Sequence, residues 1–302
     1  MNLAIVTNTQ PHHKYFVSEM AHRFNVALII HPTDKGSFRQ RLPKITHYGL
    51  LHAKLKIAGL IYQKLVKHSY ANQLKKEEKH ITDEMISDYN NLPASAIHYM
   101  PTVNSTEAIN MIKANEIDVI CFLGGDLAKQ PFIDSAKICS LNFHSGISPI
   151  YNGHKSTFHA VKDGRPNLCG GTLMYISSRV DGGDILAQHF TEITANDSAA
   201  SLFMKGIAGA VALYTTFINH IQTNGCPPAV VQERTIHFTR NADWTLADDL
   251  KLHHFEKSGR MKIYERPAKN VLYYTQPSIT IHDIVKQISE ITLSKKDMRH
   301  KI

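Results

Sequence analysis

The sequence predicts an α/β fold built on a doubly wound, mainly parallel sheet. Short, mainly apolar runs recur along the chain, at residues 3–6, 26–30 and 117–123, and Asp118 is the one charged residue within them. Such runs are typical of parallel strands that are buried on both faces. Stretches with the apolar spacing of helices separate them, as around residues 16–24 and 106–114. Strands that alternate with helices in this way pair in one sheet with helices over both faces.

The remaining elements of the first two-thirds follow from the same patterns. Further strands are expected at residues 96–100, 138–144, 171–176 and 185–190. Ser105 is expected to cap the helix at 106–114, because its hydroxyl can accept from a free backbone N–H. A long helix is expected from about Ala199 to Thr223, since Gly225 and two prolines follow it.

The pattern changes after Pro228. A strand over residues 230–238 is followed by a polar stretch around Trp244 and by mixed elements. We therefore expect one large domain at residues 1–226, with a basic helical insertion at about 35–80, and a smaller C-terminal unit at 227–302.

The composition is that of an ordinary globular protein. Of 302 residues, 43% are hydrophobic and 20% are charged, which allows a sizeable core. No run approaches about 18 uninterrupted apolar residues, so no transmembrane segment is expected. The N-terminus is interpreted as a first strand and not as a signal peptide. The four cysteines lack paired spacing, which favours buried thiols in a reducing cytoplasm over disulfides or zinc ligands: Cys121, Cys139, Cys169 and Cys226.

The net charge of +8 is unevenly distributed. Eleven lysines and arginines lie between Lys35 and Lys79, against only Glu77 and Glu78. This segment can be a solvated, amphipathic helix pair that covers the sheet edge. It can instead contact the phosphates of a nucleotide-linked substrate, an anionic membrane surface, or nucleic acid.

Two polar side chains lie near the carboxyl end of the strand at 138–144. Because side chains alternate along a strand, Asn142 and His144 point to the same side, roughly 7 Å apart. Gly146 helps to end this strand, and ligands bind at the carboxyl ends of strands in open α/β sheets. The turn at Asp181, which joins two later strands, adds a carboxylate. An amide, an imidazole and a carboxylate together suit acyl transfer.

Two turns bear on cofactor choice. The first strand-to-helix turn, at residues 7–13, has no glycine, and NAD or FAD binding needs glycines there for the pyrophosphate. His12 and His13 in this turn either meet a substrate or form a solvated helix start. Gly124 and Gly125 close a buried strand, where they either let a ligand approach the backbone or form a simple turn.

The stretch from residue 138 to residue 190 carries a specific motif. It contains Asn-x-His, a loop with Pro and Tyr-x-Gly, and an Asp-Gly turn, at Asn142, His144, Pro149, Tyr151, Gly153 and Asp181. In this it resembles the folate-dependent formyltransferases, which include glycinamide ribonucleotide, methionyl-tRNA and sugar N-formyltransferases. The resemblance implies a Rossmann-like formyltransferase fold for the large domain.

The resemblance also implies a reaction, in which an amine attacks the formyl carbon of 10-formyltetrahydrofolate. Asn142 and a protonated His144 would donate hydrogen bonds to the formyl oxygen, and Asp181 would accept the proton of the amine. Asp184 is expected to be a surface or turn residue. The implied cofactor-binding residues are Phe122, Leu123, Gly124, Gly125, Asp126, Leu127 and Ile176. The candidate substrate-binding residues are Asn8, Gln10, His12, Ser145 and Tyr151.

The predicted function is N-formyl transfer to a primary amine, best matched by an amino sugar on a nucleotide carrier, as in lipopolysaccharide biosynthesis. Methionyl-tRNA or a small metabolite could also be the acceptor. The sequence further leaves open a formyltetrahydrofolate hydrolase and a catalytically silent folate-pocket binding protein. We expect a small, anionic amine as partner, no metal, no stable nucleic-acid complex and a cytoplasmic location, with a homodimer left open.

Overall fold

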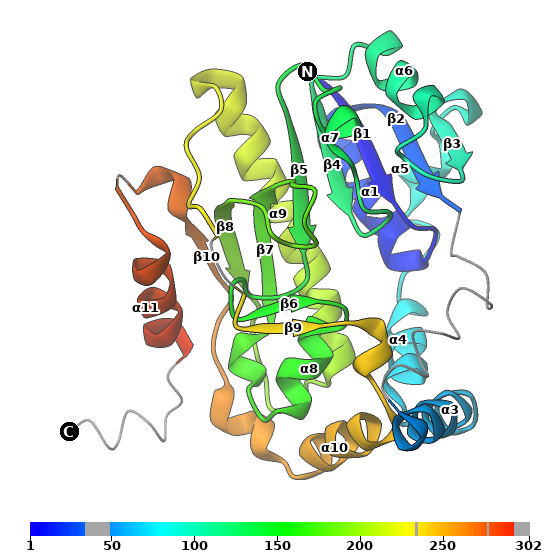
Figure 1. Cartoon of the computed structure of the whole chain (residues 1–302), viewed down its shortest axis with the longest axis vertical. Coiled ribbons are helices and arrows are strands. Elements are labelled where there is room, and N and C mark those ends of the chain that lie inside the picture. The colour runs from blue at the N-terminus through cyan, green and yellow to red at the C-terminus, as the bar shows by residue number, and fades with distance from the viewer. Residues whose placement is uncertain (34–48, 233–234, 277, 293–302) are drawn as a thin grey trace.

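The computed structural model describes residues 1–33, 49–232, 235–276 and 278–292. One eight-stranded sheet forms its centre, in the order β10-β8-β7-β5-β4-β1-β2-β3 (Figure 1). The sheet strands are β1 (Asn2–Thr7), β2 (Asn25–Pro32), β3 (Ile97–Met100), β4 (Val119–Leu123), β5 (Cys139–His144), β7 (Gly170–Tyr175), β8 (Ile185–Phe190) and β10 (Lys269–Leu272). The predicted α/β class is confirmed.

The half of the sheet from β3 to β5 is parallel. From β1 the chain winds outward to β2 and β3, and it then returns to place β4 and β5 on the other side. This reversal leaves a crevice at the carboxyl ends of β1 and β4, which is where ligands bind in doubly wound sheets. Register aligns the side chains there, since Val6 pairs with Phe122 and Phe122 with Asn142.

The other half of the sheet is antiparallel. β7 and β8 extend it beyond β5, and β10 closes the edge against β8. A separate two-stranded sheet pairs β6 (Tyr151–Gly153) with β9 (His237–Thr239). β10 thus places part of the segment after residue 226 in the main sheet, and the domain division at 226 stays a prediction.

Helices cover both faces of the sheet. The helices are α1 (Pro11–Arg23), α3 (Leu50–Leu65), α4 (Tyr70–Glu78), α5 (Ser87–Asn90), α6 (Thr106–Ala114), α7 (Gln130–Ile133), α8 (Ser156–Lys162), α9 (Ala199–Asn224), α10 (Leu246–Lys257) and α11 (Ile281–Thr292). Short 3₁₀ helices occur at Ala94–Ala96, Pro166–Leu168, Asn241–Asp243, Arg260–Tyr264 and Tyr273–Thr275. α1 and α9 share one apolar cluster with the sheet, and α6 and α7 share a cluster on the other side.

The expected ends of two helices are confirmed. The Ser105 hydroxyl accepts from the backbone N–H of Ala108 at the start of α6, and Gly225 caps α9 at a φ of 72°. Among the described helices, α9 has the length and hydropathy of a membrane span. However, 56% of its most apolar 18-residue stretch is buried inside the molecule. This matches a core helix, because α9 packs on β7 and β8.

The expectation of one strand over residues 230–238 is wrong. In that range the structure describes only the beginning of β9 (His237–Thr239) and an isolated bridge at Val230; residues 233 and 234 lie outside the described residues. Trp244, in the polar stretch that follows, is itself 1% exposed. Its ring lies edge-on to Tyr70, Phe158 and His159. Apolar burial of a large ring outweighs the polar residues around it in the sequence.

The basic insertion is helical where it is described. Its residues 34–48, which include Lys35, Arg39, Arg41 and Lys44, lie outside the described residues. α3 and α4 follow, and α3 packs against α10. Lys56 is not a free surface charge, because its Nζ donates to the carbonyls of Asn241 and Trp244 at 2.5 and 2.6 Å.

Candidate functional site

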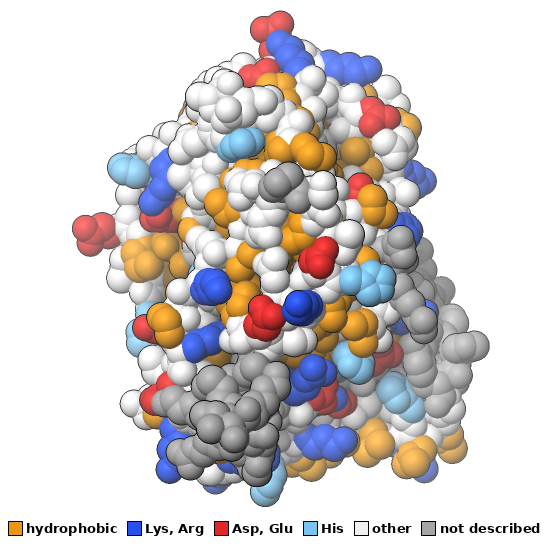
Figure 2. Space-filling view, turned by 90° about the vertical axis from the view of Figure 1, so that its left-hand side faces the viewer, with side chains coloured by type: hydrophobic (Ala, Val, Ile, Leu, Met, Phe, Trp, Pro, Cys, Tyr) orange, Lys and Arg blue, Asp and Glu red, His pale blue; other side chains and the backbone are white. Residues whose placement is uncertain are grey.

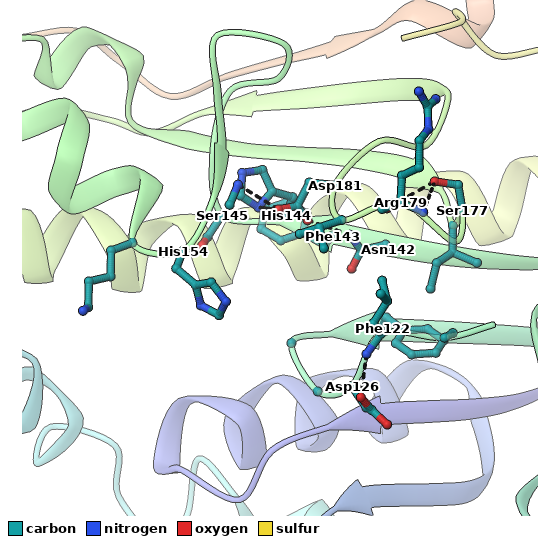
Figure 3. A pocket seen from close by; sticks show the side chains of 18 residues that line it. Phe122, Asp126, Asn142, Phe143, His144, Ser145, His154, Ser177, Arg179 and Asp181 are labelled. Carbon is teal, nitrogen blue, oxygen red and sulfur yellow. Dashed lines mark hydrogen bonds and ion pairs between the residues drawn. The ribbon is translucent and has the colours of Figure 1, made fainter. Parts of the chain in front are cut away.

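A cavity of about 320 Å³ opens at the carboxyl ends of β4 and β5. Its walls come from Phe122 and from residues 124–128, 142–145, 153–155, 176–177 and 179–181. Figure 3 shows Asn142, His144 and Asp181 close together on one side, with Phe122 and Asp126 across the cavity. The sheet therefore brings the predicted catalytic residues into one site with most of the predicted cofactor-binding residues.

Asn142 and His144 reach the cavity because of their places on β5. Leu141 and Phe143 point into the apolar cluster under α1 and α9, so the polar pair faces the other side of the sheet. The Asn142 amide Nδ2 lies 3.4 Å from Asp181 Oδ1, which leaves a second N–H of the same amide for a ligand.

His144 is held by protein groups at both ring nitrogens. Its Nδ1 lies 3.2 Å from Asp181 Oδ2, and its Nε2 lies 3.0 Å from the Tyr151 carbonyl oxygen. Both partners are acceptors, which suits a ring that donates from both nitrogens. The Ser156 hydroxyl is also 3.2 Å from Nε2. The ring must therefore exchange one of these contacts before it can donate to a substrate oxygen.

Asp181 has a constrained backbone and several hydrogen-bond partners. Its φ of 49° lies in the left-handed region, which non-glycine residues adopt rarely and mostly where the surroundings enforce it. Gly153 donates its backbone N–H to Asp181 Oδ2 at 2.9 Å. The Asp181 carbonyl accepts from the side chains of Asn152 and Gln232 at 2.9 and 2.7 Å. These contacts fix the carboxylate against His144.

The loop after β4 forms the opposite wall. Gly124 and Gly125 have φ of 72° and 101°, so the chain turns sharply under the cavity. Asp126 ties this loop down, because its carboxylate accepts from the Thr102 hydroxyl and from the Leu127 N–H. Phe122 and Ile176 add apolar side chains to the lining of the cavity, beside the polar groups of the loop. A largely apolar lining with a few polar groups is typical of a small-molecule site.

A second cavity, of about 480 Å³, adjoins the first. The two cavities share Ser145, His154 and Lys155. Gln10 and His12 line the second one, as expected for substrate-binding candidates. His12 is not at a solvated helix start, since it is 5% exposed and its Nδ1 lies 2.6 Å from Glu78 of α4.

Lys155 is a cation between the two cavities that the sequence did not single out. Its Nζ lies 4.8 Å from the ring centre of Tyr70 and 5.6 Å from that of Trp244, and it donates to Asn241 Oδ1 at 2.8 Å. Burial, with the nearby charge of Lys56, lowers the pKa of Lys155 to about 7. Among the described residues no ion pair to a carboxylate involves its ammonium group.

Three predicted residues do not line either cavity. Leu123 is 3% exposed in the core cluster under α1 and α9. Tyr151 points its hydroxyl to Asp163 at 3.0 Å, and only its carbonyl meets His144. Asn8 lies beside Gly124. Asp184 accepts a backbone hydrogen bond from Tyr175 in the turn before β8.

Several cavity residues were missed by sequence reasoning. His154 and Lys155 follow Gly153 of the motif directly, so their adjacency could have marked them. Burial lowers the pKa of His154, and the Asp181 carboxylate opposes this shift. Arg179 lines the cavity near Asp181, with its guanidinium on the Gly182 carbonyl at 2.9 Å. Among the described residues no group of three or more His, Cys, Asp or Glu side chains could hold a metal ion.

Comparisons with known proteins match this chain to formyltransferases. Residues 24–216, more than half of the chain, match the family described as formyl transferase. A methionyl-tRNA formyltransferase of Listeria welshimeri is 27% identical over 153 residues, which is 47% of this chain and 48% of that one. The chain thus spans about half the length of the curated relatives it matches.

Solved structures of similar proteins include two that differ in what they act on. A sugar N-formyltransferase from Shewanella sp FDAARGOS_354 is 13% identical at a TM-score of 0.49, over 90% of this chain and 96% of that one. A phosphoribosylglycinamide formyltransferase from Bacillus halodurans is 16% identical at 0.47, over 74% and 96%. Because the family match covers more than half of the sequence, the chain belongs to the formyl transferase family.

Proposed function

We propose that this protein transfers a formyl group from 10-formyltetrahydrofolate to a primary amine. The observation that carries the proposal is the contact of the Asp181 carboxylate with both Asn142 and His144 at one wall of the cavity. The part of the cavity lined by Phe122 and Ile176 is proposed to take the pterin of a reduced folate. When bound, this folate supplies an activated formyl group.

Asn142 and Asp181 have different proposed roles in the reaction. The amine nitrogen forms a bond to the formyl carbon, the bond from that carbon to the folate nitrogen breaks, and one proton passes from the amine to that nitrogen. Asn142 donates to the formyl oxygen as it gains negative charge, which is worth roughly 3 to 4 kcal/mol of barrier for one well-placed donor. Asp181 receives the proton of the amine, directly or through water, and passes it on.

We propose that His144 orients Asp181 and adds a second donor once its ring leaves the Tyr151 carbonyl. In the structure its Nδ1 contacts the Asp181 carboxylate and its Nε2 contacts the Tyr151 carbonyl. The ring therefore fixes the position of the carboxylate before it donates a hydrogen bond to the formyl oxygen. Water competes with the amine for the formyl carbon, and a hydrolase would use the same groups. The second cavity favours transfer, because it offers room for an acceptor and adjoins, at Ser145, His154 and Lys155, the cavity that Asp181 lines.

The acceptor is proposed to be an amine that carries an anionic group, best matched by a nucleotide-linked amino sugar. Lys155 stands between the two cavities without a carboxylate partner, where it can bind a phosphate. Tyr70 and Trp244 hold the ammonium group in place by cation–π contacts. A small, soluble acceptor of this kind is consistent with work in the cytoplasm.

The test is a formyl-transfer assay with the full chain and 10-formyltetrahydrofolate. Nucleotide-linked amino sugars, glycinamide ribonucleotide and methionyl-tRNA are offered separately, and mass spectrometry records the gain of a formyl group. We expect the gain with a nucleotide-linked amino sugar and its loss in Asp181→Asn, with Asp184→Asn as the matched control in the same turn. Release of formate at the same rate without any amine would make the protein a hydrolase. Tight binding of folate without either product would make it a binding protein.

A further inference from the structure

Helix α3 turns an apolar side away from the rest of the described molecule. Six of its leucine and isoleucine side chains are between 48% and 76% exposed: Leu50, Leu51, Ile57, Leu60, Ile61 and Leu65. One exposed leucine on a surface is ordinary, whereas six on a 16-residue helix are an apolar patch of the kind that marks an interaction site.

The exposed side chains share one side of the helix. Leu50, Ile57 and Ile61 are spaced by seven and four residues, which places them in one row on an α-helix. The other side is already used, because Gly59 lies so close to the backbone of Leu246 that a Cβ atom would stand 2.8 Å from its nitrogen. Helix α3 therefore cannot turn its apolar side inward against α10.

The charged side chains on the exposed side of α3 are all positive. Lys54 and Lys64 are exposed and lie in the same row as Ile57 and Ile61. Helix α3 contains no Asp or Glu, and the sequence has none from Lys35 to Lys76. On the face shown in Figure 2, by contrast, acidic side chains lie among the basic ones.

We propose that the exposed side of α3 docks on an anionic lipid surface. Aliphatic side chains that alternate with lysines suit a helix lying in the headgroup region, where the apolar groups enter the acyl boundary and the ammonium groups meet lipid phosphates. Pairing of α3 with a second copy of itself would bring Lys54 and Lys64 of both copies together, and α3 offers no carboxylate to offset the repulsion. The inference does not depend on the formyl-transfer proposal, since it concerns a separate surface.

The test is co-sedimentation of the full chain with vesicles, which needs no enzymatic activity. We expect binding to vesicles of phosphatidylcholine mixed with phosphatidylglycerol, and far weaker binding to phosphatidylcholine alone. Ile61→Ser should weaken binding, whereas Ile138→Ser, whose side chain has a similar exposure and lies directly before β5, should not. Lys54→Gln with Lys64→Gln should weaken binding roughly tenfold or more.

A matched charge control separates docking from a general loss of positive charge. Lys113→Gln with Lys286→Gln removes the same charge from exposed positions on α6 and α11, which lie away from α3 (Figure 1). This variant should bind as the unmodified chain does. Equal losses in both lysine variants, or no sedimentation with the anionic vesicles, would overturn the proposal. Light scattering that shows a dimer, dissociated by Ile61→Ser, would assign the face to a second copy instead.

Discussion

At the scale of single residues, the site depends on a carboxylate held in an uncommon backbone conformation. The left-handed φ of Asp181 costs of the order of 1 to 3 kcal/mol, which its surroundings must offset. The backbone N–H of Gly153 and the side chains of Asn152 and Gln232 do so. These hydrogen bonds hold Asp181 against His144 in spite of the strain.

The first prediction concerns the three proposed catalytic residues. Asn142→Ala, His144→Ala and Asp181→Asn should each lower kcat by more than about tenfold, because each removes a donor or the proton acceptor of the reaction. Steady-state kinetics with circular dichroism would check this, with Asp184→Asn as control. Full activity of a folded His144→Ala protein would contradict the mechanism.

The second prediction concerns Lys155 and pH. Burial lowers its pKa to about 7, so its charge is complete below that pH and is lost as the pH rises through it. Attraction for an anionic acceptor should fall in the same interval, and kcat/KM should fall with it.

Lys155→Arg is the matched control for this pH dependence, since a guanidinium stays charged over the whole range. The ratio of kcat/KM between the Lys155→Arg protein and the unmodified protein should rise from pH 7 to roughly pH 9. Lys155→Gln should raise KM at every pH. A ratio that does not change with pH would remove Lys155 from acceptor binding.

At the scale of elements, α9 shows how closely the helices fit the sheet. Two of its glycines are three residues apart and have different surroundings. A Cβ atom on Gly209 would overlap the ring of His189, which Asn270 holds at 2.7 Å. A Cβ atom on Gly206 would meet its nearest atom at 3.6 Å, an ordinary contact.

The third prediction follows from this pair. Gly209→Ala should lower the free energy of unfolding by about 1 to 3 kcal/mol through overpacking. Gly206→Ala should raise it by up to about 1 kcal/mol, since alanine favours a helix over glycine. Denaturant unfolding of both variants would check the opposite signs, and two changes of the same sign would mean that α9 does not pack on β8 as described.

At the scale of the whole molecule, segments far apart in the sequence meet around Trp244. This residue, the one tryptophan of the chain, shares an apolar cluster with α8, α10 and the start of α9, and its Nε1 donates to Asp249 at 3.0 Å. Tyr70 of α4 and Lys155 of the site lie against its ring. Residues after 226 therefore pack beside Lys155, in the part of the site that is proposed to bind the acceptor.

The fourth prediction is that the chain unfolds in one transition. Fluorescence of Trp244 reports on the cluster around α10, and far-ultraviolet circular dichroism reports on all helices. Because residues before and after 226 share this cluster, the two signals should change at the same denaturant concentration. Two separated midpoints would show that residues 227–302 unfold as a unit of their own.

The sequence by itself determined the strands of the sheet from β1 to β8 and the proposed catalytic wall, but not the edge strand β10. Short apolar runs bounded by turn residues predict strands that are buried on both faces, and alternation along residues 138–144 placed Asn142 and His144 on one side. The role of Asp181 as proton acceptor was inferred from the resemblance to a family. The cofactor-binding role of the loop after β4 was inferred from the same resemblance. These features are local, or they are carried by a short motif.

Only the tertiary structure decided where the remaining groups act. Trp244 is buried, Lys56 is bound to carbonyl groups of the C-terminal segment, and Lys155 stands in an aromatic enclosure because α4, α8 and the region before α10 meet there. The pKa of Lys155 and the exposure of α3 likewise depend on neighbours distant in the chain. Local spacing cannot report such contacts, since burial and charge environment arise from which segments pack together.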